Sequence, residues 1–409
     1  MLDWANQFSI CCFLDDNQYR LREHSFECLL AVNAQSVLHT TQGKVFEQLQ
    51  AFIDKSNDWC FGHLGYDLKN EIETLQSDNA DPVKFDDIFF FVPEIVLILR
   101  NNELLIGVKG QEHASVARAV FNRLPATPST PLQIEIKSRF SRNAYINTVR
   151  ELQQHILQGN CYEINFCQEF YNDHAVINPL QVYMALSKES PNPFSCYYKL
   201  EDKYLLCASP ERYLRKKGNR LISQPIKGTI RRNNKRAEAD AFNRETLQHS
   251  SKERSENIMI VDLVRNDLAK VCIEGSVKVD ELMGIYAFPQ VYQMISTVSG
   301  EVAHTMPVTD IVKATFPMGS MTGAPKKRVM ELIEQYEQTK RGLFSGAVGY
   351  ISPVQDMDFN VVIRSILYNA SNRYLSFQTG SAITYYSRAE DEYEECLLKA
   401  EAIKKVLNG

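Results

Sequence analysis

The sequence lacks several features that would assign the chain to a specialised class of protein. Its ten cysteines include no C-x-x-C pair, and its eight histidines show no spacing typical of metal ligands. Cysteines scattered through apolar segments are typical of reduced, buried thiols rather than of a disulfide framework or a zinc site. Any metal in this protein would therefore be held by carboxylates.

Long apolar runs and basic clusters are also missing. No run approaches the ~20 apolar residues that a membrane-spanning helix needs. The N-terminus carries Asp3 where a signal peptide has lysine or arginine. A net charge of −5, with no basic cluster among aromatic residues, argues against nucleic-acid binding. We expect a cytoplasmic enzyme that binds neither membrane nor nucleic acid.

A proline-rich stretch divides the 409-residue chain. The sequence L-P-A-T-P-S-T-P breaks any regular structure and predicts a linker. The predicted organisation is an N-terminal α/β region over residues 1–124, a linker over residues 125–138 and a catalytic region over residues 139–409.

The catalytic region opens with a predicted helix and strand. Ser141 is expected to cap the helix, which ends at Gly159. Residues 161–170 then alternate with a period of two, which places Glu163 and Asn165 on one face of a strand. That face either meets solvent or lines a cleft.

The stretch Q-P-I-K-G-T at residues 224–229 holds one lysine between a proline and a glycine. Proline fixes φ and glycine tolerates positive φ, so this loop is expected to follow a sharp, stiff path. The pKa of Lys227, held beside apolar groups such as Ile226, is expected to be lowered, which suits a nucleophile or base. The alternative is a surface lysine on a hairpin turn. Glu211, at the end of a predicted strand upstream, favours the functional interpretation.

Two pairs of glutamates share a spacing of three on separate predicted helices. Glu253 and Glu256 lie on one face of the first helix, and Glu392 and Glu395 lie on one face of the second. Oxygen ligands of this kind suit Mg²⁺, which keeps several waters and accepts a substrate carboxylate. Solvated acidic helix faces are the common alternative, and Lys399 could simply pair with Glu395.

Three further segments favour anion binding. The loop F-P-M-G-S-M-T-G-A-P-K at residues 316–326 runs into a predicted helix N-terminus, where free N–H groups favour an anion. It is not a P-loop, because the G-x-x-x-x-G-K-[ST] order is missing. Arg364 lies in an apolar strand and needs a carboxylate partner, from a ligand or from the protein. The small residues at 379–383 leave backbone N–H groups approachable.

These motifs, in this order, resemble those of the chorismate-utilising enzymes, a family that includes anthranilate, isochorismate, salicylate and aminodeoxychorismate synthases. The resemblance runs from about residue 141 to the C-terminus, with a weaker likeness at residues 62–67. It implies an α+β fold, with large antiparallel β-sheets packed face to face and helices on the outside. The strings that carry it are P-I-K-G-T, S-E-N-I-M-I-V-D-L-V-R-N-D-L, F-P-M-G-S-M-T-G-A-P-K, F-S-G-A-V-G-Y and E-Y-E-E-C.

The resemblance also implies a site for chorismate with Mg²⁺ as cofactor. The metal would hold the ring carboxylate, and Glu211 matches the acid that protonates the departing 4-hydroxyl. The matching positions are Glu256, Glu395, Glu253 and Glu392 for the metal, Ser320 and Gly380 for the ring carboxylate, Arg364, Tyr350 and Lys399 for the enolpyruvyl carboxylate, and Thr229 elsewhere in the substrate site.

Lys227 separates the branches of the family. Anthranilate synthases have alanine at this position, whereas aminodeoxychorismate synthases have lysine. The implied chemistry is attack of the Lys227 amine on ring C2, followed by attack of ammonia on C4. Ammonia would come from a separate glutamine amidotransferase, and a separate lyase would complete 4-aminobenzoate for folate synthesis. Anthranilate synthesis and a non-catalytic chorismate-binding protein are the alternatives.

Three positions depart from the pattern of the family. Gln293 replaces a histidine that is tied to pyruvate loss, which fits an enzyme that stops at aminodeoxychorismate. Ala382 replaces a glycine and is expected to crowd the ring carboxylate. Glu163 aligns with the lysine that activates water in the isochorismate and salicylate branches, which disfavours a water-adding reaction. It replaces a glutamine of the ammonia-using branch, and its charge could help to bind ammonium.

Overall fold

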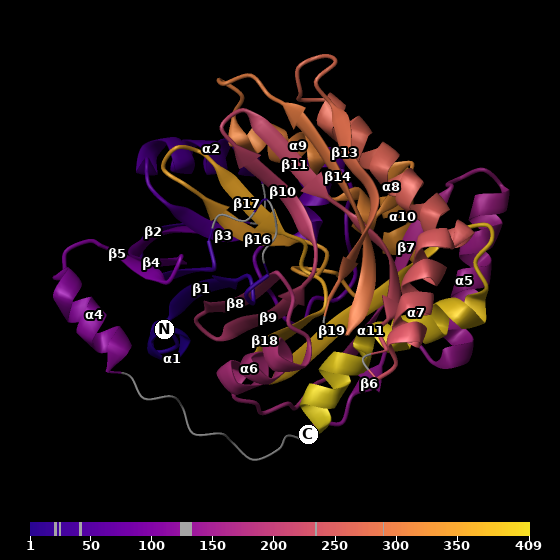
Figure 1. The fold of residues 1–409 in the computed structure, drawn as a ribbon, viewed down its shortest axis with the longest axis horizontal. Helices are drawn as coiled ribbons and strands as arrows, with labels where there is room; N and C mark the ends of the chain where they lie inside the picture. Colours follow the sequence, from indigo (N-terminus) through magenta and orange to yellow (C-terminus); the bar gives the residue numbers. More distant parts are fainter. Residues whose placement is uncertain (20–22, 24–25, 41–42, 123–132, 234, 289) are drawn as a thin grey trace.

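The computed structural model describes residues 1–19, 23, 26–40, 43–122, 133–233, 235–288 and 290–409, and Figure 1 shows their arrangement. Antiparallel strands form the body of the molecule, and most helices lie on its outside. The predicted α+β class is confirmed. Within the described ranges, no helix is both long and apolar enough to cross a membrane.

The first sheet layer runs through consecutive antiparallel pairs from β5 to β7. Two short strands add to β7, namely β6 (Lys137–Ser138) and β15 (Gly323–Ala324). In spatial order the strands of this layer are β5 (Glu103–Val108), β4 (Ile88–Arg100), β2 (Cys28–Thr40), β1 (Ile10–Asp15), β8 (Phe194–Leu200), β9 (Lys203–Ser209), β18 (Ser365–Asn369), β19 (Tyr374–Ile383) and β7 (Glu163–Asn172).

The second sheet layer branches from β4 through β3. It continues to β14, which pairs with β11, β12 and β13. In order the strands are β3 (Cys60–Leu64), β16 (Ala347–Ile351), β17 (Met357–Asn360), β10 (Arg212–Lys217), β11 (Arg220–Gln224) and β14 (Val291–Glu301), with β12 (Ile226–Arg231) and β13 (Lys278–Ala287) beside β14.

The two layers pack face to face, and β1 shows how this arises. Cys12 packs into the core between the layers, whereas Cys11 and Phe13 point to the opposite face, where helices cover the first layer. Because successive side chains of a strand alternate between faces, a strand buried on both sides needs an uninterrupted apolar sequence. The continuous apolar segments of the sequence therefore belong to strands sandwiched on both faces.

Helices close both cores. Ser141 caps α5 as predicted, because its Oγ accepts a hydrogen bond from the backbone N–H of Ala144 at 3.2 Å. The helices on the outer face of the first layer include α4 (His113–Phe121), α5 (Arg142–Leu157), α6 (Pro179–Glu189) and α11 (Ala389–Asn408). The helices around the second layer include α2 (Val45–Ser56), α7 (Ala237–His249), α8 (Ser251–Ala269) and α9 (Val308–Thr315). The other helices are α1 (Leu2–Ala5), η1 (Tyr66–Leu68), α3 (Lys69–Glu73), η2 (Gly319–Met321) and α10 (Lys326–Tyr336).

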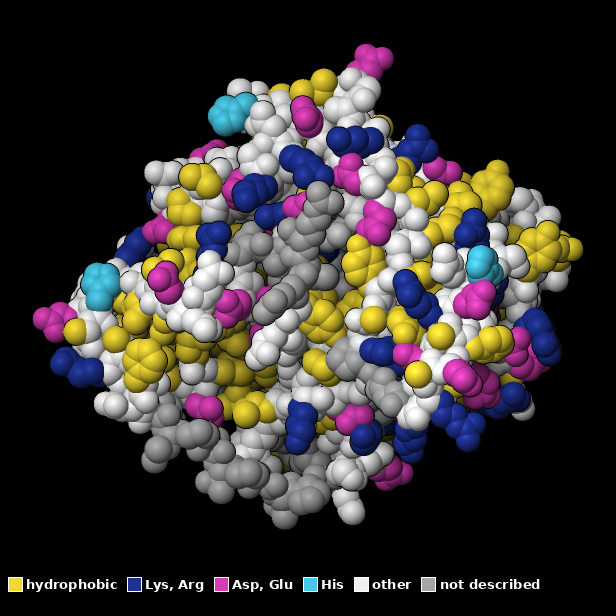
Figure 2. All heavy atoms as spheres, in the orientation of Figure 1, with side chains coloured by type: hydrophobic (Ala, Val, Ile, Leu, Met, Phe, Trp, Pro, Cys, Tyr) yellow, Lys and Arg dark blue, Asp and Glu magenta, His cyan; other side chains and the backbone are white. Residues whose placement is uncertain are grey.

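Strands from the N-terminal region are built into both layers. β1 lies between β2 and β8, and β3 lies between β4 and β16. Strands that precede the predicted linker are therefore hydrogen-bonded to strands that follow it. Residues 123–132, which include most of that linker, lie outside the described residues, and the proposed domain boundaries stay a prediction. On the face shown in Figure 2, acidic and basic side chains are interspersed.

Candidate functional site

A cavity of about 750 Å³ lies where β12, α8, the glycine-rich loop and α11 meet. This volume is in the range of pockets that bind small molecules. Asn165 lines it, so the polar face of β7 meets the cavity rather than solvent. The predicted site residues on its walls are Glu211, Lys227, Thr229, Glu253, Glu256, Gln293, Ser320, Arg364, Gly380, Ala382, Glu395 and Lys399.

Lys227 reaches the cavity from an irregularity in β12. The pairing of β12 with β14 shifts register between Ile226 and Thr229, and Gly228 has a φ of +99°. An extra residue of this kind bends a strand and redirects its side chains, and glycine tolerates the positive φ without strain. The sharp path predicted for this stretch is therefore confirmed.

The predicted direction of the Lys227 pKa was wrong. Burial alone lowers it, but the charges of Glu163 and Glu256 outweigh burial and hold the pKa above its usual value. The Nζ atom lies 3.1 Å from Oε1 of Glu163, and these side chains are 11% and 1% exposed. Lys227 is therefore an ammonium at neutral pH. The partner responsible sits on β7, too far along the chain for local sequence to reveal.

The strand that carries Glu163 is fixed by the glycine-rich loop. β15 pairs Gly323 with Ile164 and Ala324 with Glu163. A Cβ at Gly323, whose φ is +148°, would lie 2.1 Å from the carbonyl oxygen of Glu163. Glycine is thus required for the loop to approach β7 this closely.

Glu211 follows Pro210 in the connection from β9 to β10 and is 4% exposed. The Oγ of Ser320 donates a hydrogen bond of 2.6 Å to Oε1 of Glu211. Burial raises the pKa of Glu211 to about 7, although the hydrogen bond from Ser320 and the charge of Lys227 oppose the rise. This carboxyl group can therefore carry a proton near neutral pH. Ser320, expected on a substrate carboxylate, is held by Glu211 here.

Three of the four glutamates, one from the first pair and both from the second, surround a lysine. The Nζ atom of Lys252 is 2.9 Å from Glu392, 3.8 Å from Glu395 and 3.9 Å from Glu256. Lys252 was not among the predicted site residues. The sequence could have revealed this contact, because Lys252 precedes Glu256 by four residues and residues four apart share a helix face.

The carboxylates around Lys252 are the candidate ligands for a magnesium ion. Within the described residues, no three acidic, histidine or cysteine side chains converge closely enough to hold a metal by themselves. Oε1 of Glu256 and Oε2 of Glu392 are nevertheless buried without a hydrogen-bond partner in the described structure. Mg²⁺ is usually held by one or two carboxylates, several waters and substrate oxygens. An ion of that kind would fit between these glutamates once the ammonium group of Lys252 moves out of the position it occupies.

Two of the glutamates around Lys252, Glu256 and Glu395, differ in their charge. Burial raises the pKa of Glu256 to about 8, although Lys227 and Lys252 oppose the rise. Burial would also raise the pKa of Glu395, but Lys399 and Lys252 lower it to about 2. Glu256 thus tends to hold a proton near neutral pH when no other cation is bound, whereas Glu395 stays ionised.

Arg364 is a cation on the wall of the cavity. It lines the cavity, and its Nη1 donates to the carbonyl oxygen of Lys399 at 3.3 Å. No carboxylate forms an ion pair with it in the described ranges. Burial lowers its pKa to about 10, which still leaves it charged at neutral pH. Lys399 instead donates to the carbonyl oxygen of Gly380 and pairs with Glu395, each at 2.8 Å.

The remaining predicted residues shape the wall. Gln293 is 3% exposed, and its Oε1 has no hydrogen-bond partner in the described structure. Thr229 lies opposite Gln293 in the β12–β14 pair. Ala382 lies opposite Asn165, and a Cβ at Gly380 would lie 2.1 Å from a β7 carbonyl oxygen.

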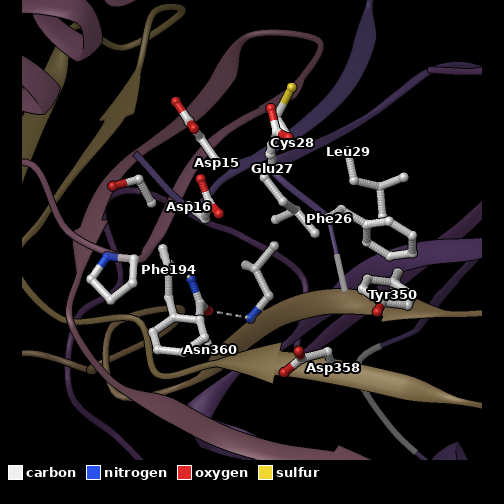
Figure 3. Close-up of a pocket in the computed structure, with 14 residues that line it drawn as sticks. Asp15, Asp16, Phe26, Glu27, Cys28, Leu29, Phe194, Tyr350, Asp358 and Asn360 are labelled. Carbon is white, nitrogen blue, oxygen red and sulfur yellow. Dashed lines mark hydrogen bonds between the residues drawn. The ribbon is translucent and has the colours of Figure 1, made fainter. Parts of the chain in front are cut away.

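Tyr350 does not join the other predicted residues. It lines a separate cavity of about 60 Å³, and Figure 3 shows it beside Phe26. Its ring packs against Phe26, Trp59 and Phe61 at centroid distances of 5.5–6.1 Å. The aromatic residue of the same motif that lines the large cavity is Phe344. The predicted contact of Tyr350 with a ligand in that cavity therefore does not fit this structure.

Comparisons with known proteins agree with this geometry. The profile of the chorismate binding enzyme family matches residues 10–405. The chain is 33% identical over 363 residues to aminodeoxychorismate synthase component 1 of Bacillus subtilis (strain 168), covering 85% of this chain and 76% of the relative. It is 31% identical over 366 residues to anthranilate synthase component 1 of Aquifex aeolicus (strain VF5), covering 85% and 73%.

A solved structure extends the similarity to the fold. The crystal structure of anthranilate synthase component I from Streptococcus pneumoniae TIGR4 matches with a TM-score of 0.80 and 25% sequence identity, covering 95% of this chain and 94% of that one. The family profile spans nearly the whole chain, and the relatives are similar along most of their length. The protein described here is a member of the chorismate binding enzyme family.

Proposed function

We propose that this protein converts chorismate and ammonia to 4-amino-4-deoxychorismate, with Lys227 as nucleophile, Glu211 as general acid and Mg²⁺ as cofactor. The observation that carries the proposal is the presence of Lys227 and a protonatable Glu211 on the walls of one cavity. Relatives named for aminodeoxychorismate synthesis support the same choice.

The polar ends of the cavity suit the two carboxylates of chorismate. Arg364 is charged and lacks a protein carboxylate among its described contacts, so it would bind the enolpyruvyl carboxylate through two parallel hydrogen bonds. The ring carboxylate would lie toward Glu256 and Glu395, the residues that would hold Mg²⁺. When bound, the ion would neutralise the ring carboxylate among these acidic groups.

In the proposed reaction, the amine of Lys227 forms a bond to C2 of the ring. The ring double bonds shift, and the C4–O bond breaks as Glu211 gives its proton to the departing oxygen, which leaves as water. Ammonia then bonds to C4, the double bonds shift back, and Lys227 departs as an amine. Glu211 recovers a proton from the new C4 ammonium group.

The source of ammonia belongs to the proposal. We expect a separate glutamine amidotransferase to supply it, as the component names of the relatives suggest. Ammonium salts would replace that partner in the test tube.

Identification of the product tests the reaction. Purified protein with chorismate, Mg²⁺ and an ammonium salt is expected to form aminodeoxychorismate, detected by liquid chromatography and mass spectrometry. Direct appearance of fluorescent anthranilate would contradict the proposal and favour the second branch. Unchanged chorismate, with binding demonstrated by calorimetry, would favour a non-catalytic protein.

The pH dependence tests the role of Glu211. The acid must be protonated, so kcat/KM for chorismate is expected to fall about tenfold per pH unit above about pH 7. Free ammonia is held constant at each pH, because ammonium also titrates. Ser320→Ala removes a hydrogen bond that lowers the pKa of Glu211, so the falling limb should move to higher pH. An unmoved limb would assign the titration to another group.

A further inference from the structure

The ion pair between Lys227 and Glu163 raises a problem for a nucleophilic lysine. The Nζ atom carries a proton at neutral pH, because the Glu163 carboxylate lies 3.1 Å away and the charges of Glu163 and Glu256 outweigh the opposing effect of burial. An ammonium has no lone pair and cannot attack carbon. The proton must leave Nζ before or during the attack, so a group within hydrogen-bond reach has to accept it.

Glu163 is the carboxylate placed for this transfer. Glu256 and Glu395 act on Lys227 through their charges, but among the described contacts neither forms an ion pair with it. Glu211 accepts a hydrogen bond from Ser320, and in the proposed reaction it donates its own proton to the departing hydroxyl. Only the Glu163 contact among these is short enough for direct proton transfer.

Glu163 would lose its ion-pair partner if the charge of Lys227 were removed alone. Its side chain is 1% exposed, and Oε2 has no hydrogen-bond partner in the described structure. A buried carboxylate left without a cation beside it is costly, because burial disfavours the charged form. Transfer of the proton from Nζ to Glu163 removes both charges together.

We propose that Glu163 accepts the proton of Lys227 and returns it at the end of each cycle, an assignment that rests on the proposed function. The N–H bond of the ammonium breaks as an O–H bond forms on Glu163, and the freed electron pair of Nζ makes the bond to C2. When the C2–N bond breaks, Lys227 leaves as a neutral amine and takes the proton back. Glu163 is then again an anion, and no proton is gained or lost.

Adduct formation without ammonia isolates this step. Wild type and Glu163→Gln are mixed with chorismate and Mg²⁺, quenched at successive times, and examined by intact-mass spectrometry for the adduct on Lys227. Glutamine keeps the shape and a hydrogen bond but cannot accept the proton, so adduct formation should slow by about 10²-fold or more. Single-turnover product formation with ammonium present is measured in parallel and should slow equally.

Glu169→Gln is the matched control. Glu169 is a buried carboxylate on the same strand, paired with Arg139 away from the cavity. This variant should form the adduct at the wild-type rate. In Glu163→Ala, added formate should restore the rate at least tenfold, because a free carboxylate replaces the base; a purely structural role for Glu163 predicts no rescue.

The outcomes separate the two proposals. A wild type that forms no aminodeoxychorismate overturns both. An active wild type with an equally fast Glu163→Gln overturns the assignment of Glu163 alone, as does a slow Glu163→Ala that formate leaves slow. Calorimetry with chorismate confirms that each variant is folded and binds substrate.

Discussion

Replacing Lys227 with alanine should abolish ammonia-dependent turnover while chorismate still binds. The substitution removes the attacking atom, and the loss of a covalent nucleophile lowers enzymatic rates on the order of 10⁴-fold or more. Binding should persist because, among the described contacts, Lys227 forms its ion pair with Glu163 and contacts neither Arg364 nor the pair of Lys399 with Glu395. Turnover is measured by product chromatography, and the dissociation constant by calorimetry.

The control is Lys217→Ala, which removes an exposed lysine at the end of β10 and should leave the rate unchanged. In the wild type without ammonia, a peptide containing Lys227 should carry the mass of chorismate less water. A Lys227→Ala enzyme that makes aminodeoxychorismate at the wild-type rate would end the nucleophile proposal.

Glu256→Gln and Glu395→Gln should each abolish magnesium-dependent turnover without unfolding the protein. Each change removes a charged oxygen from a site that would hold the cation and the substrate carboxylate together. Loss of at least about 10²-fold in kcat/KM at limiting Mg²⁺ is expected, the scale seen when a metal site is disturbed. Calorimetry with Mg²⁺ should show the loss of binding directly.

Asp262→Asn provides the comparison on the same helix. Asp262 is an exposed carboxylate of α8 that pairs with Arg265, so its removal should change neither magnesium affinity nor rate. Retention of the wild-type rate by either glutamate variant at limiting Mg²⁺ would contradict the paired-helix site.

The sequence predicted which residues meet better than it predicted how they interact. Lys227, Glu211 and Arg364 lie in short motifs that end strands or bends, and all three line one cavity. Their partners come from distant segments. Glu163 reverses the expected pKa shift of Lys227, and Lys252 lies among the glutamates of both helices.

The error at Tyr350 has a different physical cause. The motif F-S-G-A-V-G-Y carries an aromatic residue at each end, and only the first, Phe344, lies before the strand. Tyr350 lies inside β16, opposite Phe61 of β3, where its ring joins an aromatic cluster. Motif resemblance alone did not distinguish the cavity-lining ring from the core ring.

The pairing of early strands with late strands sets the order in which the sheets can form during synthesis at the ribosome. β3, at residues 60–64, finds its second partner only when β16, at residues 347–351, has been made. At about 5–20 residues per second, this delay is on the order of 15–60 s. The pairs of β4 with β2, β3 and β5 can form meanwhile, and β1 can pair with β8 once residues 194–200 are made, which leaves the other edge of β3 exposed. The nascent chain must therefore keep one unpaired apolar strand edge, that of β3, from aggregating until translation is nearly complete.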